Sequence, residues 1–279
     1  MKPVAFLEII RPVNDVMIGL AVIAGYLVGG GRAPESALLG FLTGFLISGF
    51  SMVINDIFDV NVDTLNRRMR PLVRGDISVR EAWALSLSMA ALGLLISFMS
   101  GIDTLCVAAA FAVLAFLYSR RLKREGLAGN VVVALSIAIP FLYGGLIAGI
   151  NYLLVFVMFS TSFLTGLSRE ILKAVADVRG DSASGIRSLP ATLGIEASSA
   201  ISAALIAVAV PIAYIPVIVG AYSVFYLSGV TVASIIFILT AVDISRLRDP
   251  QRAYVLKKRM LIPMAIGLIT YVVQGLLLA

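Results

Sequence analysis

The stretch FLTGFLISGFSMVINDIFDVNVD, residues 41–63, decides the fold of this chain, because an apolar run of membrane length ends there in a cluster of acids. About 20 apolar residues cross a bilayer core, and a backbone at that depth must satisfy its own hydrogen bonds, so the run is expected to be helical. Charge at membrane depth is costly unless it is paired or useful. The acids at the end of the run therefore predict a functional site.

The whole chain shares this apolar character. Of its 279 residues, 60% are hydrophobic and 14% are charged, and its mean hydropathy is +1.02. A soluble domain carries about 25% charged residues, so we predict an all-α, polytopic membrane protein with a single transmembrane domain over residues 1–279. The chain has one Cys and no His, which excludes an intrachain disulfide, His-ligated zinc and a His general base. We predict nine spans, at about 12–30, 36–58, 81–100, 103–119, 129–149, 152–172, 193–213, 218–242 and 256–278.

The charges fall almost entirely on one side of these nine spans. All of the 22 Lys and Arg except Arg32 lie on the side that holds the N-terminus. Because cytoplasmic loops are rich in Lys and Arg, the N-terminus and the site are expected on the cytoplasmic side of the cell membrane, and the C-terminus on the outer side. Of the 16 acids, only Glu35 and Asp103 lie on the far side. The positive-inside rule does not explain so many cytoplasmic acids, whereas a metal site there does.

Two DxxxD pairs, Asp59/Asp63 and Asp177/Asp181, close the second and the sixth predicted spans. A spacing of four places two side chains on one helix face, and Asn55 lies one turn before Asp59. If the two helices face each other, both pairs converge on one pocket, where Mg²⁺ would offset the repulsion between them. The alternative is that these acids are solvated helix ends. That alternative accounts less well for two pairs that each adjoin a basic loop.

Basic residues near both clusters are candidates to hold phosphate oxygens. Arg67, Tyr118 and Lys123 are the stronger candidates, because spacing places them beside the carboxylates or combines a hydroxyl group with positive charge. The basic group from residue 246 to residue 259 is interpreted as a determinant of topology that contacts lipid headgroups. Membrane anchoring explains three other cations better, namely Arg68, Arg121 and Arg124.

Four motifs together resemble the UbiA superfamily of intramembrane prenyltransferases. They are NDxxDxxxD at 55–63, RPLVxG at 70–75, YSxxLK at 118–123 and DxxxD at 177–181. The resemblance covers nearly the whole chain in order, and RExxKxxxDxxGD at 169–181 is most similar to archaeal members that build ether lipids. It implies nine helices around a central cavity, with cytoplasmic cap segments in long loops at about 59–80 and 173–192.

The resemblance also implies an activity and a site. The expected reaction transfers a geranylgeranyl group from geranylgeranyl diphosphate to the hydroxyl of geranylgeranylglyceryl phosphate. Carried over residue by residue, one Mg²⁺ would be bound by Asn55, Asp59 and Asp63, with Asp56 in support, and a second Mg²⁺ by Asp177 and Asp181. These four DxxxD aspartates and Lys173 form the expected catalytic set. The residues expected to contact the donor diphosphate or the acceptor phosphate are Arg11, Asn14, Arg67, Tyr118, Lys123 and Lys173.

The implied partners are an isoprenyl diphosphate donor, a lipid-phosphate acceptor and membrane lipids, with no nucleic acid and no obligate protein partner. One alternative is an aromatic prenyltransferase of quinone or haem biosynthesis. Quinone-making relatives carry a more acidic second motif, so the Gly and Arg between Asp177 and Asp181 favour a phosphate-bearing acceptor. The other alternative is a cation or phosphate transporter, which typically binds near the bilayer midplane. The sequence leaves open the prenyl chain length, the proton acceptor and the oligomeric state.

Overall fold

The computed structural model describes residues 2–65, 67–183 and 187–277, without the side chains of residues 2, 179 and 181–183, and every regular element in these ranges is helical. Eight helices in the described part are long and apolar enough to cross a membrane. This confirms the polytopic all-α prediction. The first predicted span corresponds to the shorter helix Pro12–Val28, so the count of nine spans stays a prediction.

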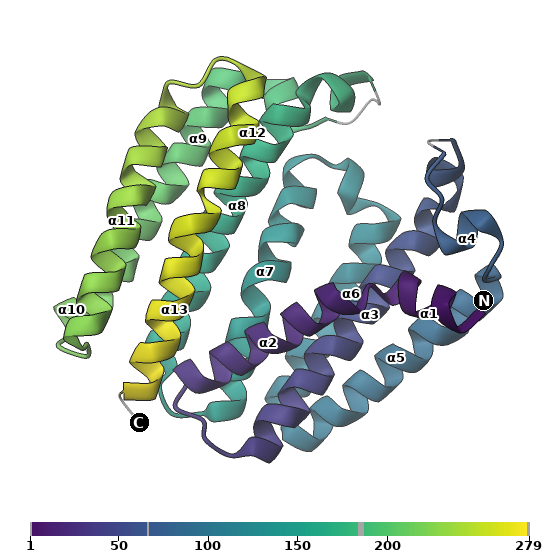
Figure 1. Cartoon of the computed structure of the whole chain (residues 1–279), viewed down its shortest axis with the longest axis horizontal. Coiled ribbons are helices and arrows are strands. Elements are labelled where there is room, and N and C mark those ends of the chain that lie inside the picture. The colour runs from purple at the N-terminus through teal and green to yellow at the C-terminus, as the bar shows by residue number, and fades with distance from the viewer. Residues whose placement is uncertain (1, 66, 184–186, 278–279) are drawn as a thin grey trace.

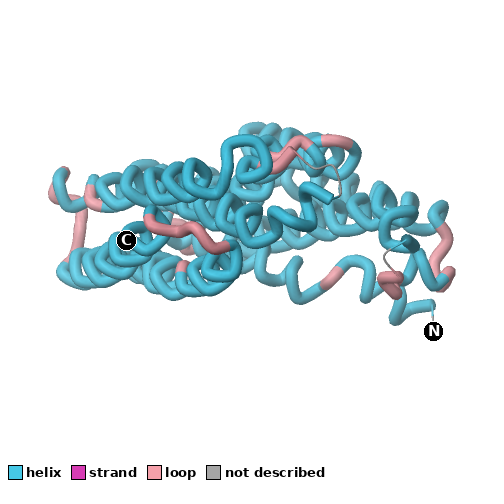
Figure 2. Tube along the Cα trace, turned by 90° about the horizontal axis from the view of Figure 1, so that it is seen from above, coloured by secondary structure: helices cyan, strands magenta, loops and turns pink. Residues whose placement is uncertain are grey.

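The helices follow one another with short connections (Figure 2). Their bounds are α1 Lys2–Ile10, α2 Pro12–Val28, α3 Pro34–Leu65, α4 Pro71–Arg74, α5 Val79–Ser100, α6 Ile102–Arg120, the 3₁₀ turn η1 Leu122–Arg124, α7 Leu127–Ala148, α8 Tyr152–Ala183, α9 Leu189–Ala213, α10 Ile215–Ile218, α11 Val224–Ser245, α12 Pro250–Arg259 and α13 Leu261–Leu277.

The helices form two groups that meet at α2 and α7. In one group α3 packs against α5 and α6, and in the other α8 packs against α9 and α12 while α11 packs against α13. Helix α7 contacts both α2 and α8, so it joins the groups. In Figure 1 α12 lies near the top and α4 at the right, beside the end of α3, whereas α10 lies at the left and the α2–α3 connection at the bottom. The charged ends of α3 and α8 therefore lie on the same side of the molecule as α4 and α12.

Helices α2 and α7 cross at close range because both carry glycine at the contact. A Cβ atom added to Gly25 would lie 2.1 Å from the carbonyl oxygen of Phe141, and one added to Gly144 would lie 2.0 Å from that of Val22. Small residues of this kind let two membrane helices bring their backbones together. The seam between the two helix groups is thus fixed by backbone contact.

Helices α3 and α8 continue beyond the ends that hydropathy predicts. The predicted spans stop at 58 and 172, whereas the helices run to Leu65 and Ala183. The prediction that long loops begin at 59 and 173 is therefore wrong. Hydropathy marks where the chain stops being apolar, whereas acids spaced by four residues still suit a helical backbone.

Short helical pieces occupy what remains of the two predicted loops. The first piece is α4, which begins at Pro71, a residue with a preset φ that suits a first helical position. In the second loop, Gly194 (φ 84°, ψ 166°) interrupts α9 and separates residues 189–193 from the long part of the helix. The cap role of these two pieces stays a prediction.

Candidate active site

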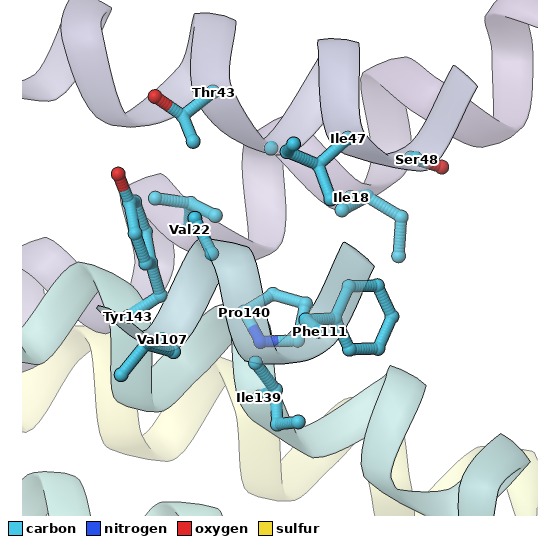
Figure 3. A pocket seen from close by; sticks show the side chains of 12 residues that line it. Ile18, Val22, Thr43, Ile47, Ser48, Val107, Phe111, Ile139, Pro140 and Tyr143 are labelled. Carbon is cyan, nitrogen blue, oxygen red and sulfur yellow. The ribbon is translucent and has the colours of Figure 1, made fainter. Parts of the chain in front are cut away.

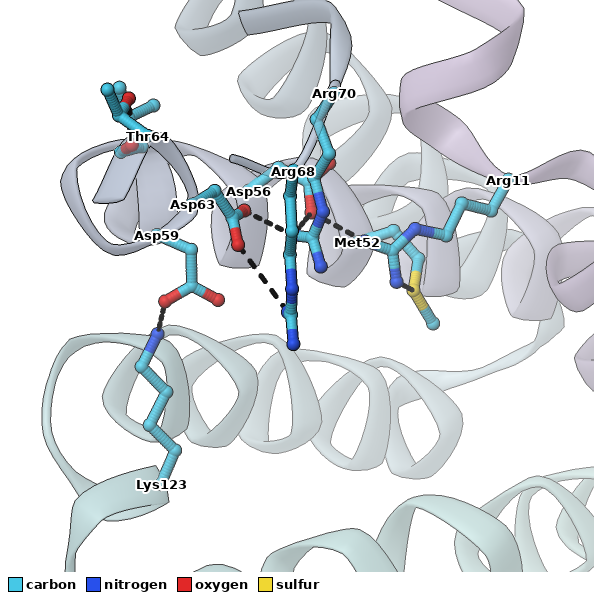
Figure 4. Close-up of polar contacts among 10 residues, drawn as sticks. Arg11, Met52, Asp56, Asp59, Asp63, Thr64, Arg68, Arg70 and Lys123 are labelled. Atoms are coloured by element: carbon cyan, nitrogen blue, oxygen red, sulfur yellow. Dashed lines mark hydrogen bonds and ion pairs between the residues drawn. The ribbon is translucent and has the colours of Figure 1, made fainter. Parts of the chain in front are cut away.

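The C-terminal end of α3 carries three carboxylates at helical spacing. Asp56 and Asp63 are buried, with 3% and 1% of their surface exposed, and Asp59 is half-buried. Figure 4 shows all three on one side of the helix, facing cationic side chains from other elements. The predicted placement of Asp59 and Asp63 on one helix face agrees with this geometry.

Two arginines pair with the buried carboxylates. Arg70 Nη1 lies 2.6 Å from Asp56 Oδ1 and 2.8 Å from Asp63 Oδ2, so one nitrogen contacts both acids. Arg11 Nη2 also lies 2.6 Å from Asp56 Oδ1 (Figure 4). Arg11 stands between α1 and α2 in a left-handed conformation (φ 54°, ψ 63°). It precedes Pro12, and helices usually end at or before the residue that precedes a proline. This turn directs its side chain across α3.

Lys123 forms an ion pair with Asp59. Its position comes from η1, the short turn between α6 and α7, which is followed by Gly126 in a positive-φ conformation (φ 55°). A Cβ atom at Gly126 would lie 1.9 Å from the carbonyl oxygen of Arg187, so the chain that follows α8 packs directly on this turn. The α6–α7 junction therefore lies between the charged end of α3 and the chain that follows α8.

Tyr118, at the end of α6, is half-buried and experiences the charges of both Asp59 and Glu170. Glu170 belongs to α8 and Asp59 to α3, so Tyr118 is within reach of charges on both helices. On α8, Asp177 is exposed and forms no ion pair with any described side chain. The side chain of Asp181 lies outside the described residues. The convergence of the two DxxxD pairs on one pocket thus stays a prediction.

The remaining predicted contacts have less structural context. Asn14 is exposed and Asn55 is half-buried, and neither side chain has a hydrogen-bond partner among the described residues. Arg67 is exposed at a positive φ of 53° just after α3, and its guanidinium likewise has no ion-pair partner in the described ranges. Arg68 contacts Asp63 at 3.5 Å from an exposed position.

Sequence reasoning missed two residues of this site. Arg70 was passed over in favour of Arg67, although it begins the quoted RPLVxG motif and directly precedes the helix-starting Pro71. Glu170 is not among the predicted site residues, yet it is a buried acid that contacts two cations. A Pro that fixes the local backbone, and an acid between two bases on one helix, were the available signals.

The chemistry of the α3 donors fits a hard divalent cation. Carboxylate and amide oxygens are the groups that Mg²⁺ prefers. Asp63 Oδ2 is buried and accepts no hydrogen bond, although Arg70 Nη1 is close by. Within the described residues, no three acidic or cysteine side chains gather closely enough to hold an ion. Arginine and lysine nitrogens neutralise the α3 carboxylates in this arrangement.

Apolar cavities lie among the helices below this charged end. One, of about 40 Å³, is lined by α3 residues that include Ile47 and Ser48, together with Phe111 and Tyr143 (Figure 3). A larger one, of about 390 Å³, lies among α2, α7, α8, α9, α11 and α13, where Phe141 and Tyr271 contribute to its wall. The residues of α3 that line the smaller cavity precede Asp56 by about two to four turns of the same helix.

The family and the fold are established by comparison with known proteins. The sequence profile of the UbiA prenyltransferase family matches residues 17–265. A digeranylgeranylglyceryl phosphate synthase from Methanoculleus marisnigri is 36% identical over 245 residues, which is 86% of each chain.

Solved structures agree with this assignment. A structure of digeranylgeranylglyceryl phosphate synthase superposes with a TM-score of 0.93 at 31% identity, over 99% of both chains. A UbiA homologue from Archaeoglobus fulgidus, solved with GPP and Mg²⁺, shares the fold with a TM-score of 0.70 at 23% identity, over 96% of this chain and 99% of its own. The chain therefore belongs to the UbiA prenyltransferase family.

Proposed function

We propose that this protein transfers a geranylgeranyl group from geranylgeranyl diphosphate to the hydroxyl of geranylgeranylglyceryl phosphate, which forms the second ether bond of an archaeal membrane lipid. The observation that carries the proposal is the charged end of α3, where Asp56, Asp59 and Asp63 meet Arg11, Arg70 and Lys123 on the helix that also lines an apolar cavity. Relatives that share 36% identity carry the corresponding name.

The reaction needs a leaving diphosphate and a protected prenyl cation. As the bond between the allylic carbon and the diphosphate oxygen breaks, its electron pair stays on the diphosphate. Arg11, Arg70 and Lys123 already lie against the α3 carboxylates, and as fixed donors they would stabilise the charge that develops on that leaving group. The acceptor hydroxyl oxygen then bonds to the allylic carbon, and its proton passes to a carboxylate or to the released diphosphate, since the chain has no His.

Asn55, Asp59 and Asp63 on α3, and Asp177 and Asp181 on α8, are the residues we propose for two Mg²⁺ ions. Bound there, a divalent ion supplies Lewis-acid stabilisation to the leaving diphosphate. The protein's own part is to present oxygen ligands at the end of α3 and to keep the neighbouring cations in place. The apolar helix walls exclude water, which would otherwise capture the prenyl cation.

The test uses purified protein in lipid or detergent. Geranylgeranyl diphosphate and geranylgeranylglyceryl phosphate are incubated with Mg²⁺ and, in parallel, with EDTA, and the products are followed by mass spectrometry. A diether phosphate that forms only with Mg²⁺ supports donor, acceptor and metal together. If an aromatic acceptor is prenylated with release of diphosphate and no diether forms, the proposed acceptor is wrong and an aromatic one takes its place. No product with any acceptor would contradict the enzymatic proposal and favour transport.

A further inference from the structure

Three charged side chains lie together on α8, one to two turns before Asp177. Glu170 is buried, with 5% of its surface exposed, and it lies between two cations. Its Oε1 is 3.3 Å from Arg169 Nη1, and its Oε2 is 3.3 Å from Lys173 Nζ. We call Arg169, Glu170 and Lys173 the α8 triplet. Its two cations and one anion leave it with a net positive charge.

The cations of the α8 triplet have hydrogen-bonding capacity to spare. Their contacts with Glu170 exceed the usual 2.7–2.9 Å of a charge-assisted hydrogen bond, whereas Arg11 and Arg70 approach Asp56 to 2.6 Å. Arg169 Nε is buried and has no partner among the described residues. The Lys173 side chain is 53% exposed. The triplet can therefore accept an anion without breaking a strong ion pair.

The α8 triplet and the α3 carboxylates belong to different helices and pair with different cations. The charges of Glu170 on α8 and of Asp59 on α3 both reach Tyr118. On the α3 side, the cations already neutralise Asp56, Asp59 and Asp63. A reaction that joins two phosphorylated lipids needs two separate places for their head groups, and the cations of α8 and those that face α3 offer two such places.

We propose that Arg169 and Lys173 bind the phosphate monoester of the lipid acceptor, and that Glu170 is a positioning residue that holds these two cations at a fixed separation. This inference rests on the proposed function. An arginine fork with a nearby ammonium suits a phosphate with several acceptor oxygens. The buried carboxylate between them offsets their mutual repulsion, so that both remain directed to one side in the absence of the substrate. The donor diphosphate is left to the α3 end.

The experiment measures KM for each substrate in three variants, Arg169→Gln, Glu170→Gln and Lys173→Gln. A lost charge-assisted phosphate contact corresponds to a rise of about ten- to a hundredfold in KM for geranylgeranylglyceryl phosphate. The KM for geranylgeranyl diphosphate should stay within about twofold. Lys173→Arg, which keeps the charge, should recover most of the affinity. Arg121→Gln, at an exposed ion pair with Glu125, is the matched control and should behave like the wild type.

A second acceptor, geranylgeranylglycerol without its phosphate, separates phosphate binding from a structural role. With this acceptor the substitutions should lower kcat/KM much less than they do with geranylgeranylglyceryl phosphate, because the phosphate contact that the variants lack is not made. An equal loss with both acceptors, or an equal rise in KM for the donor, would overturn the assignment. If Glu170→Gln fails to fold, the comparison of the two acceptors is made with Lys173→Gln, because Lys173 is exposed enough for its substitution to leave the fold intact. Absence of the diether phosphate in the wild-type reaction would instead remove the proposed acceptor, and this assignment with it.

Discussion

Arg70 contacts two buried carboxylates of α3 with a single nitrogen, at 2.6 Å from Asp56 and 2.8 Å from Asp63. A buried acid that loses a close cationic partner is costly. Without Arg70, Asp56 would keep Arg11 at 2.6 Å. Asp63, in contrast, would keep only the longer contact with Arg68. Arg68 makes a 3.5 Å contact with Asp63 from an exposed position, and exposed ion pairs contribute little. Two arginines of one loop thus differ sharply in what their removal should do.

We predict that Arg70→Met lowers the free energy of unfolding by on the order of 3 kcal/mol and impairs turnover. Arg68→Met should change that free energy by less than about 1 kcal/mol. Denaturation in detergent, followed by circular dichroism, measures both. Equal effects of the two substitutions would show that the pairing at Arg70 carries no special weight.

Asp59 and Asp177 give a second prediction at the level of single residues. Asp59→Ala and Asp177→Ala should each abolish prenyl transfer while leaving the melting temperature close to that of the wild type, because neither side chain is fully buried. Product formation is measured by mass spectrometry. Wild-type activity in either variant would contradict the two-metal proposal.

The sequence was informative about which residues share a helix face and less so about loops. The placement of Asp59 and Asp63 on one helix face follows from their spacing of four residues. No such period exists among Arg67, Arg68 and Arg70, where the backbone leaves the helix and Arg67 adopts a positive φ. Which of these arginines turns inward depends on the start of α4 at Pro71, a tertiary feature that periodicity does not contain.

At the scale of elements, α1 is tied to the loop that carries α4. Arg74 donates to both oxygens of Glu8, at 3.0 and 2.6 Å, and its Nε donates to Asp76 at 2.7 Å. The hydrogen bond from Arg74 is the main cause that lowers the pKa of Glu8 below its ordinary value of 4.5. Because the folded-state pKa is the lower one, this contact stabilises the fold above the unfolded-state pKa.

The α1–α4 contact predicts a dependence on pH. Glu8→Gln should lower the melting temperature by a constant amount from pH 7 down to about pH 4.5, the ordinary value for Glu. The difference from the wild type should close as the pH falls further through the lowered pKa, since wild-type Glu8 then becomes neutral as well. Thermal scans of both proteins between pH 7 and pH 3 test this. A gap that persists at pH 3 would assign the effect to something other than charge.

The crossing of α2 and α7 supplies a prediction with its own control. Gly144→Ala places a methyl group against the backbone of α2 and should cost about 1–3 kcal/mol of stability. Gly267→Ala, on α13, meets no heavy atom within 4 Å and should be neutral or stabilising by up to about 1 kcal/mol. The unfolding midpoints of the two variants, each compared with that of the wild type, test this prediction. Comparable losses would mean that the crossing can relax.

For the whole molecule, the side of the membrane on which each loop lies is testable. The connection with Glu125, between α6 and α7, and the connection with Ile150, between α7 and α8, lie at opposite ends of α7 and are both exposed. In a Cys106→Ala background, we expect a membrane-impermeant maleimide to label Glu125→Cys in inverted vesicles and Ile150→Cys in right-side-out vesicles. The reverse pattern would invert the proposed orientation.

The length of α3 has a consequence for where the chemistry occurs. At 1.5 Å per residue, its 32 residues extend about 48 Å, whereas the hydrocarbon core of a bilayer is about 30 Å thick. The acidic end can therefore lie in the polar headgroup layer while the rest of α3 crosses the hydrocarbon core. Removing one turn would move the carboxylates about 5.4 Å toward the hydrocarbon core. A hydrated diphosphate would then have to enter that core in order to react. The length of α3 therefore sets the depth in the membrane at which the prenyl chain and the diphosphate of a substrate meet the protein.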